Sequence, residues 1–279
     1  MAGADVTAGG GLITRIVVGA ALIVVACAAV WYGGPVFTAL VAIAVLLMSA
    51  EWCVMHGIGR GFRLASLIVL AFTGGVAARQ SSVDAIIVLA ASAGLLGLFM
   101  RSFDRQRAFW LAAGLLYCGL PMIALIWLRG LPNTGIALTI AVLAVVWATD
   151  IGAYFTGRAI GGSKLAPAIS PNKTWAGAIG GVIAAIITGA ILTSLAIGPT
   201  VDGDVSHIQT IVIFSIIAAF LAVVAIVGDL FESWLKRRAG VKDSGNLLPG
   251  HGGVMDRIDG LVPVAVFAAA IVAISGITP

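Results

Sequence analysis

The chain has 279 residues, of which 61% are hydrophobic and only 10% are charged, and its formal net charge is +4. Soluble domains carry about 25% charged residues, so this composition excludes a water-soluble globular protein and indicates an integral membrane protein. The basic residues are not interleaved with aromatic ones, which argues against nucleic-acid binding. The three cysteines lie apart in apolar segments and form no metal-binding pattern.

Nine apolar segments follow one another along the chain, each close to the length of about 20 residues that a membrane-spanning helix needs. They cover roughly residues 12–31, 35–52, 62–79, 83–100, 108–128, 134–154, 175–197, 208–235 and 261–277. We therefore predict an all-α integral membrane protein with about nine transmembrane helices. The whole chain, residues 1–279, is expected to form a single polytopic domain.

The basic residues are distributed unevenly over the predicted loops. If the N-terminus and every second loop lie on one side, that side carries 14 of the 16 Lys and Arg residues, and the other side carries Arg79 and Arg129. Cytoplasmic loops are the basic ones in membrane proteins. We therefore expect a multi-pass protein of the cell inner (plasma) membrane, with a cytoplasmic N-terminus and the C-terminus outside. The basic loops would also attract anionic lipids.

The first half of the chain contains few polar side chains. Glu51 ends the second apolar segment and stands close to His56. An acid at this depth can be a functional group. The favoured interpretation is a helix-end residue at the level of the lipid headgroups, with His56 in a solvated loop.

Charged residues enter the apolar segments in the second half. Asp150 follows a long apolar run, so it needs a compensating cation, a metal ion or an arginine such as Arg158. Residues 170–174 (SPNKT) then precede a helix that starts near Trp175, which Ser170 or Thr174 could cap. Lys173 and the free N–H groups of that helix start suit a phosphate. The alternative is a capped basic loop with no ligand.

Residues 228–259 hold the densest charge, with five of the twelve acidic and five of the sixteen basic residues. In a helix, Asp229, Glu232, Ser233 and Lys236 fall within an arc of about 100°. Such a face cannot point at lipid, so we expect it to face a cavity open to the cytoplasm. An intrahelical salt bridge between Glu232 and Lys236 is the alternative, but it leaves Asp229 unexplained.

A run rich in glycine and turn residues follows, and two acids come after it. Glycines permit positive φ and a close approach of the backbone to an anion. Asp256 and Asp259 then precede the last apolar segment. One or two carboxylates, completed by water and substrate phosphates, suit Mg²⁺, whereas lone histidines without cysteine ligands argue against zinc. Together with the basic residues, these groups favour a phosphoryl- or nucleotidyl-transfer site.

The same region carries a specific family pattern. It comprises Ser233-Trp234-Leu235-Lys236-Arg237, Lys242-Asp243, Gly245, Leu248-Pro249, His251-Gly252-Gly253 and Asp256-Arg257-Ile258-Asp259. This pattern resembles the signature of the phosphatidate cytidylyltransferases, or CDP-diacylglycerol synthases. The regions 150–162 and 170–174 also resemble that family. One position departs from it, because Ala176 stands where relatives typically have Glu.

The resemblance implies transfer of CMP from CTP to phosphatidate, which yields CDP-diacylglycerol and pyrophosphate for phospholipid synthesis. Residues 134–279 would then form the catalytic half, and residues 1–130 mainly the scaffold. It implies catalytic roles for Asp229, Ser233, Lys236, Arg237 and Asp256. The implied substrate-binding residues are Ser170, Asn172, Lys173, Thr174, Lys242, His251, Gly252, Gly253 and Arg257. The implied ligands of Mg²⁺ are Asp229 and Asp256, with Asp259 and Asp150 as further candidates, and a second metal or a monovalent cation is left open.

Other functions remain compatible with the residues. A related lipid cytidylyltransferase or a CTP-dependent lipid kinase would use another lipid acceptor. An ion-coupled transporter would also place acids and glycines at membrane depth. The polar residues cluster at one interface, however, and the sequence contains no visible inverted repeat. The expected partners are CTP, phosphatidate and other anionic lipids, with a homodimer left open.

Overall fold

A computed structural model describes residues 11–197, 205–247 and 252–275. The first half contains α1 (Gly11–Tyr32), α2 (Gly34–Met55), α3 (Arg60–Ala77), α4 (Ser82–Arg101) and α5 (Arg105–Gly130). The second half contains α6 (Gly135–Ile160), β1 (Lys164–Ala166), β2 (Ser170–Thr174), α7 (Trp175–Ile197), α8 (Val205–Arg238), α9 (Met255–Ile258) and α10 (Leu261–Ser275). The predicted α-helical architecture is correct, apart from this one short hairpin in the part of the chain that the structure describes.

The helices are long and apolar. Seven of those described, α2 to α8, have the length and hydropathy needed to cross a membrane, and the described apolar parts of α1 and α10 are shorter. Large apolar side chains such as Ile68 and Leu195 are about three-quarters exposed, at 70% and 74%. Outward-facing apolar residues of this kind fit a lipid environment. The chain is thus a helical membrane protein, and each of the nine predicted segments coincides with one helix.

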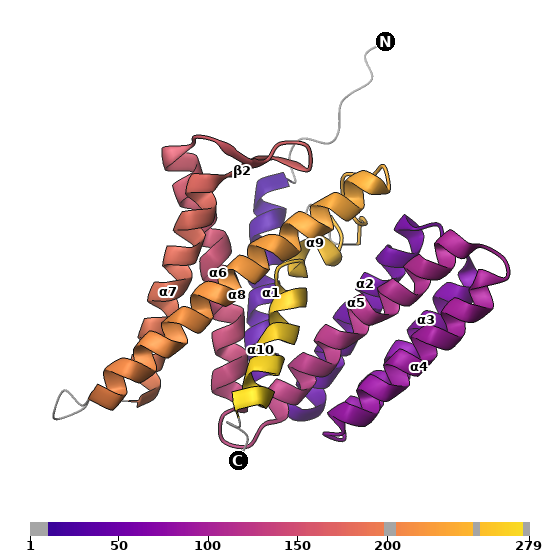
Figure 1. Cartoon of the computed structure of the whole chain (residues 1–279), viewed down its shortest axis with the longest axis horizontal. Helices are drawn as coiled ribbons and strands as arrows, with labels where there is room; N and C mark the ends of the chain where they lie inside the picture. Colours follow the sequence, from indigo (N-terminus) through magenta and orange to yellow (C-terminus); the bar gives the residue numbers. More distant parts are fainter. Residues whose placement is uncertain (1–10, 198–204, 248–251, 276–279) are drawn as a thin grey trace, which may run out of the picture.

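Two hydrophobic cores hold the helices together. One lies among α2, α3, α4 and α5, and the other lies among α6, α7 and α8. Helix α10 contributes residues to both cores, and α8 adds Leu235 to the first. Figure 1 shows α2 to α5 on one side of the molecule and α6 and α7 on the other, with α10 between them and α8 running obliquely across the middle. The two halves therefore meet mainly where α10 and α6 pack against α5, with Leu235 of α8 added at one end.

Glycines allow α6 and α7 to pack at very short range. A Cβ atom on Gly152 would lie 2.6 Å from Ala184 Cβ, and one on Gly181 would lie 2.8 Å from the Thr149 carbonyl oxygen. Small residues at a membrane helix interface permit this close approach. The hairpin β1–β2, paired antiparallel, connects the two helices at one end. Asp150 on α6 and Lys173 on β2 are thereby held near each other.

A similar close contact joins α8 to the start of α10. A Cβ atom on Gly228 would lie 2.5 Å from Pro263 Cγ and 2.8 Å from the Asp259 carbonyl oxygen. This contact brings Asp229, the next residue on α8, to the acidic segment that precedes α10. The hairpin, the C-terminal end of α8 and α9 all lie at the same end of the molecule (Figure 1).

Candidate active site

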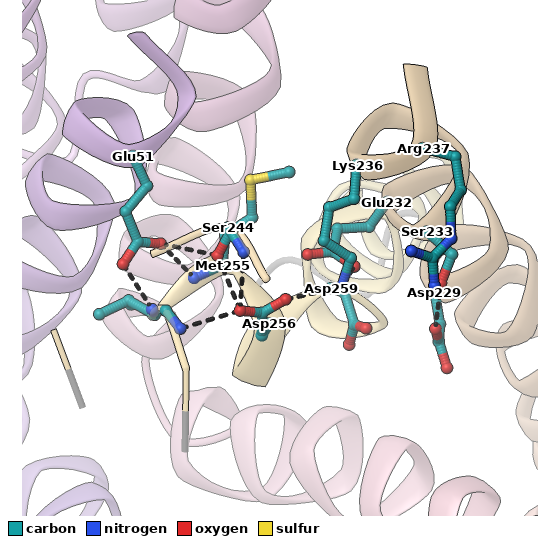
Figure 2. A network of polar contacts seen from close by, with 12 residues as sticks. Glu51, Asp229, Glu232, Ser233, Lys236, Arg237, Ser244, Met255, Asp256 and Asp259 are labelled. Atoms are coloured by element: carbon teal, nitrogen blue, oxygen red, sulfur yellow. Dashed lines mark hydrogen bonds and ion pairs between the residues drawn. The ribbon is translucent and has the colours of Figure 1, made fainter. Parts of the chain in front are cut away.

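Asp256 is the centre of a hydrogen-bond network at this end of the molecule (Figure 2). Its Oδ1 atom lies 2.6 Å from Lys236 Nζ. Its Oδ2 atom accepts from Gly253 N at 2.8 Å and from both the N and the Oγ of Ser244 at 3.0 Å. Burial alone would raise the pKa of Asp256, but Lys236 and the backbone donors outweigh it and hold the pKa below its usual range. Asp256 is therefore an ionised carboxylate in a fixed orientation.

Lys236 connects Asp256 to a second carboxylate. Its Nζ atom lies 2.6 Å from Oε2 of Glu232, one turn earlier on α8, and Glu232 is completely buried. The predicted intrahelical salt bridge thus exists, and the same ammonium group also pairs with Asp256. Oε1 of Glu232 has no hydrogen-bond partner among the described residues. One ammonium group is therefore shared between two carboxyl groups.

A second ion pair lies beside the first on α8. Lys173 on β2 pairs with Asp229, and Ser233 Oγ lies 3.5 Å from Asp229 Oδ1. The hairpin positions Lys173, and Thr174 ends it by accepting a hydrogen bond of 3.1 Å from Gly177 N in the first turn of α7. The predicted cap by Thr174 is therefore confirmed. The polar face of α8 that the sequence predicts therefore contacts Lys173 on β2 and Asp256 on α9.

Asp259 is a further carboxyl group in the field of these acids, and at neutral pH it is mostly protonated. Burial, followed by Asp229 and Glu232, raises the pKa of Asp259 to about 8. Asp150 acts in the same direction. Four acids therefore lie within electrostatic range of one another, with Lys173 and Lys236 as the cations paired to them in the part of the chain that is described. Crowded carboxyl groups of this kind ionise more readily when a cation binds among them, and carboxylates are the ligands that Mg²⁺ prefers.

The donor set fits Mg²⁺ when substrate supplies the remaining ligands. No three acidic, cysteine or histidine side chains among the described residues converge closely enough to hold a metal ion by themselves. Mg²⁺ needs only one or two carboxylates besides water and phosphate oxygens. Asp229 and Asp259 meet that requirement. Before Asp256 could bind the ion, it would have to give up one of the hydrogen bonds that its oxygens now accept.

Two predicted residues have partners that the sequence did not indicate. Asp150 lies in the field of Asp229 and Lys173, whereas Arg158 donates to the Tyr154 hydroxyl at 3.1 Å. Arg237 Nε lies 3.4 Å from the Ile169 carbonyl oxygen, so it links α8 to the hairpin.

The remaining predicted residues differ in their exposure to solvent. Gly252 has the positive φ that its glycine predicts, at 80°, and Gly253 is buried against Ser244 and Glu51. Ser170 is half-buried, and Asn172, Lys242 and Arg257 are exposed. His251 lies outside the described residues. Ala176 is half-buried in the first turn of α7.

The first half also contributes to this network, against the favoured interpretation of the sequence. Glu51 is only 4% exposed, and its carboxylate accepts from Ser244 Oγ, Val254 N and Met255 N. The prediction of a headgroup-level residue was wrong. The signal available in the sequence was its isolation, because Glu51 is the only acid between Asp5 and Asp84.

His56 also differs from its prediction as a solvated loop residue. Its ring is half-buried and lies 4.3 Å from the Trp110 ring and 4.5 Å from the Trp52 ring, centroid to centroid. Its Nδ1 atom lies 2.9 Å from the Trp52 carbonyl oxygen. Packing against Trp52 and Trp110 therefore shields part of the histidine ring from solvent.

Known proteins resemble the chain over nearly its whole length. Residues 13–275 match the sequence model of the cytidylyltransferase family. The chain is 42% identical over 258 residues to proteins named phosphatidate cytidylyltransferase from Brucella suis biovar 1 (strain 1330) and Brucella melitensis biotype 1, with 90% of each chain covered. It is 40% identical over 166 residues to the Bacillus subtilis (strain 168) protein of that name, covering 60% of this chain and 58% of the relative. The chain therefore belongs to the cytidylyltransferase family.

Proposed function

We propose that this protein transfers CMP from CTP to phosphatidate and releases pyrophosphate. The phosphate oxygen of phosphatidate attacks the α-phosphorus of CTP, and the bond from that phosphorus to the pyrophosphate oxygen breaks. The observation that carries the proposal is the pairing of Lys173 and Lys236 with three acids at one end of a membrane protein. Its near full-length similarity to phosphatidate cytidylyltransferases supports the choice of substrates.

The side chains divide the work by charge. Lys173 and Lys236, each paired with carboxylates, would hold the phosphates, with Ser233 and Arg237 beside them on α8. Asp229 and Asp259, with Asp256 and Asp150 near them, would hold Mg²⁺, which neutralises phosphate charge when bound. The exposed Asn172, Lys242 and Arg257 border this region from the hairpin and from the segment between α8 and α10. Because attack and departure occur on substrate atoms, no covalent enzyme intermediate is needed.

We infer that the site faces the cytoplasm of an inner-membrane protein with nine crossings. Of the 16 Lys and Arg residues, 14 fall on the side that this arrangement assigns to the cytoplasm. Helix α1 begins at the site end of the molecule, and α10 ends at the opposite end (Figure 1), as an odd number of crossings requires. A cytoplasmic site gives direct access to soluble CTP.

The test is an assay of purified protein with Mg²⁺, phosphatidate and CTP labelled at either the α- or the γ-phosphorus. The expected result is α-label in the lipid and γ-label in pyrophosphate. Label from the γ-phosphorus in the lipid would instead identify a lipid kinase. Product formed only with another lipid acceptor would identify a related lipid cytidylyltransferase. Folded protein that forms no labelled lipid with any acceptor would refute the proposal.

A further inference from the structure

Glu51 is buried in the amino-terminal half and forms no ion pair with any described residue. An isolated buried carboxylate is costly unless hydrogen bonds replace its hydration. Glu51 receives three such bonds, from Val254 N and Met255 N at 2.9 Å and from Ser244 Oγ at 3.1 Å. The described donors to Glu51 therefore all come from one loop that lies 193 to 204 residues away in sequence.

The two backbone donors belong to the start of α9. The first N–H groups of a helix have no partners within the helix, and the N-cap residue of α9, Val254, has a side chain that cannot accept a hydrogen bond. Glu51 supplies the missing acceptor from α2. Its oxygens leave no room for a larger residue, because a Cβ atom on Gly245 would lie 2.7 Å from Oε1 and one on Gly253 would lie 2.6 Å from Oε2. The loop and the carboxylate fit each other closely.

The same short loop holds Asp256 from its other side. Gly253 N and Ser244 N donate to Asp256, whereas the next two amides, of Val254 and Met255, donate to Glu51 (Figure 2). Ser244 Oγ lies 3.1 Å from Glu51 Oε2 and 3.0 Å from Asp256 Oδ2. Because this hydroxyl has a single hydrogen, the two carboxylates share one donor. Moving the loop away from Glu51 would therefore move the donors of Asp256.

We propose that Glu51 is a positioning residue for the transfer reaction. It fixes Ser244 and the start of α9 at Val254 and Met255, which orient Asp256. Asp256 in turn holds Lys236 at 2.6 Å. Glu51 itself touches neither the substrate nor the reacting atoms. The amino-terminal helices thus set the geometry of the reacting end, beyond serving as a scaffold. This inference rests on the proposed function for its kinetic test, and its structural part is tested separately.

The test is Glu51→Gln, which preserves shape and replaces one acceptor oxygen with an NH₂ group that cannot accept from an amide. We expect kcat to fall about 10- to 100-fold, as for other residues that orient a reactive group, with a smaller change in the KM for CTP. Asp84→Asn at the exposed start of α4 makes the same chemical change away from the site and should leave kcat unchanged. A merely structural role would lower the yield of folded protein but not the kcat of the folded fraction.

Ser244→Ala keeps both backbone bonds to Glu51 and removes the shared hydroxyl, so it tests the link if Glu51→Gln does not fold. We expect a smaller fall in kcat, and a double variant whose loss is less than the product of the single losses, because both residues act through one loop. Wild-type kcat in either folded single variant, or independent losses in the double variant, would overturn the inference.

Hydrogen exchange gives a readout that does not depend on activity. In Glu51→Gln, or in Ser244→Ala if that variant alone folds, the amides of residues 252–256 should exchange faster than in the wild type. The helical amides of α5 should keep their protection. Unchanged exchange at residues 252–256 would refute the positioning role even if no lipid product were formed by any variant. Absence of product from the wild type would refute the proposed function alone.

Discussion

At the residue scale, Asp256 is the most connected side chain of the site. It accepts from three groups of its own loop and pairs with Lys236 on α8. Asp256→Asn keeps the shape but removes the negative charge that holds Lys236 and the orientation of the loop. We expect kcat to fall about 100- to 1,000-fold, as when a preorganised electrostatic group is lost.

The measurement is steady-state turnover of protein whose folding has been verified by its elution from a sizing column and its Tm. The Asp84→Asn variant again provides the control for an acid-to-amide change at an exposed position. If the turnover of Asp256→Asn stayed within about threefold of the wild type, this carboxylate would have no role in the reaction. A threefold change is well short of the tenfold that about 1.4 kcal/mol represents.

His56 makes the stability of the fold sensitive to acid. Burial lowers the pKa of His56 below its ordinary value, and the positive charge of Arg238 acts in the same direction against the opposing effect of the Trp52 carbonyl. Folding therefore favours the neutral imidazole. The contribution of His56 to the free energy of unfolding is fully present above the pKa of histidine in the unfolded chain, about 6.5. It is lost as the pH falls from that value toward the lower pKa of His56 in the folded protein.

His56→Phe keeps an aromatic ring between Trp52 and Trp110 but cannot titrate. We expect the wild type to lose more Tm than His56→Phe when pH is lowered from 7.5 to 5.5, because only the wild type must either hold a neutral ring or bury a charged one. Thermal unfolding of both proteins in the same detergent provides the comparison. Parallel Tm curves for the two proteins over this range would show that His56 does not contribute.

At the element scale, the glycines between α6 and α7 determine how close the hairpin lies to α8. Replacing a helical glycine with alanine normally stabilises a helix by about 0.5–1 kcal/mol. At Gly152 the added methyl group would lie 2.6 Å from Ala184 Cβ and 2.8 Å from the Gly180 carbonyl oxygen, so the helices would have to separate. We expect Gly152→Ala to lower Tm and to weaken CTP binding, because Lys173 would move away from Asp229.

Gly75→Ala is the matched control, since a Cβ atom on Gly75 of α3 would meet nothing within 4 Å. Its Tm should equal or exceed that of the wild type, and its KM for CTP should be unchanged. The two variants differ only in packing, so measuring both separates the helix contact from helix propensity. Equal effects of the two substitutions would show that the α6–α7 contact tolerates an added methyl group.

The helices could be predicted from sequence because each is a continuous apolar run, and the helical period correctly placed Asp229, Glu232, Ser233 and Lys236 on one face. The partners of that face could not be predicted in the same way. Glu51 meets its donors across 193 to 204 positions of the chain, and no local pattern encodes such a distance. The hairpin was missed because β1 and β2, with three and five residues, are too short to show a period.

At the scale of the whole molecule, the candidate site lies where the two halves of the chain meet. Glu51 comes from the first core, Asp150 and Lys173 come from the second half, and α8 packs against both cores. Relative movement of the halves would separate Glu51 from the loop that holds Asp256. The charge pattern in residues 228–259 therefore depends for its geometry on Glu51 in the first half of the chain.

The orientation of the whole chain follows from its basic residues and can be tested with single cysteines. Ser102→Cys lies after α4 on the proposed cytoplasmic side, and Pro132→Cys lies between α5 and α6 on the proposed outer side; both positions are exposed. In right-side-out vesicles, a membrane-impermeant maleimide should label Pro132→Cys and not Ser102→Cys, and in inverted vesicles the pattern should reverse. The wild type provides the background from its own three cysteines. Because 14 of the 16 Lys and Arg residues would otherwise face outward, an opposite labelling pattern would contradict both the positive-inside argument and the cytoplasmic site.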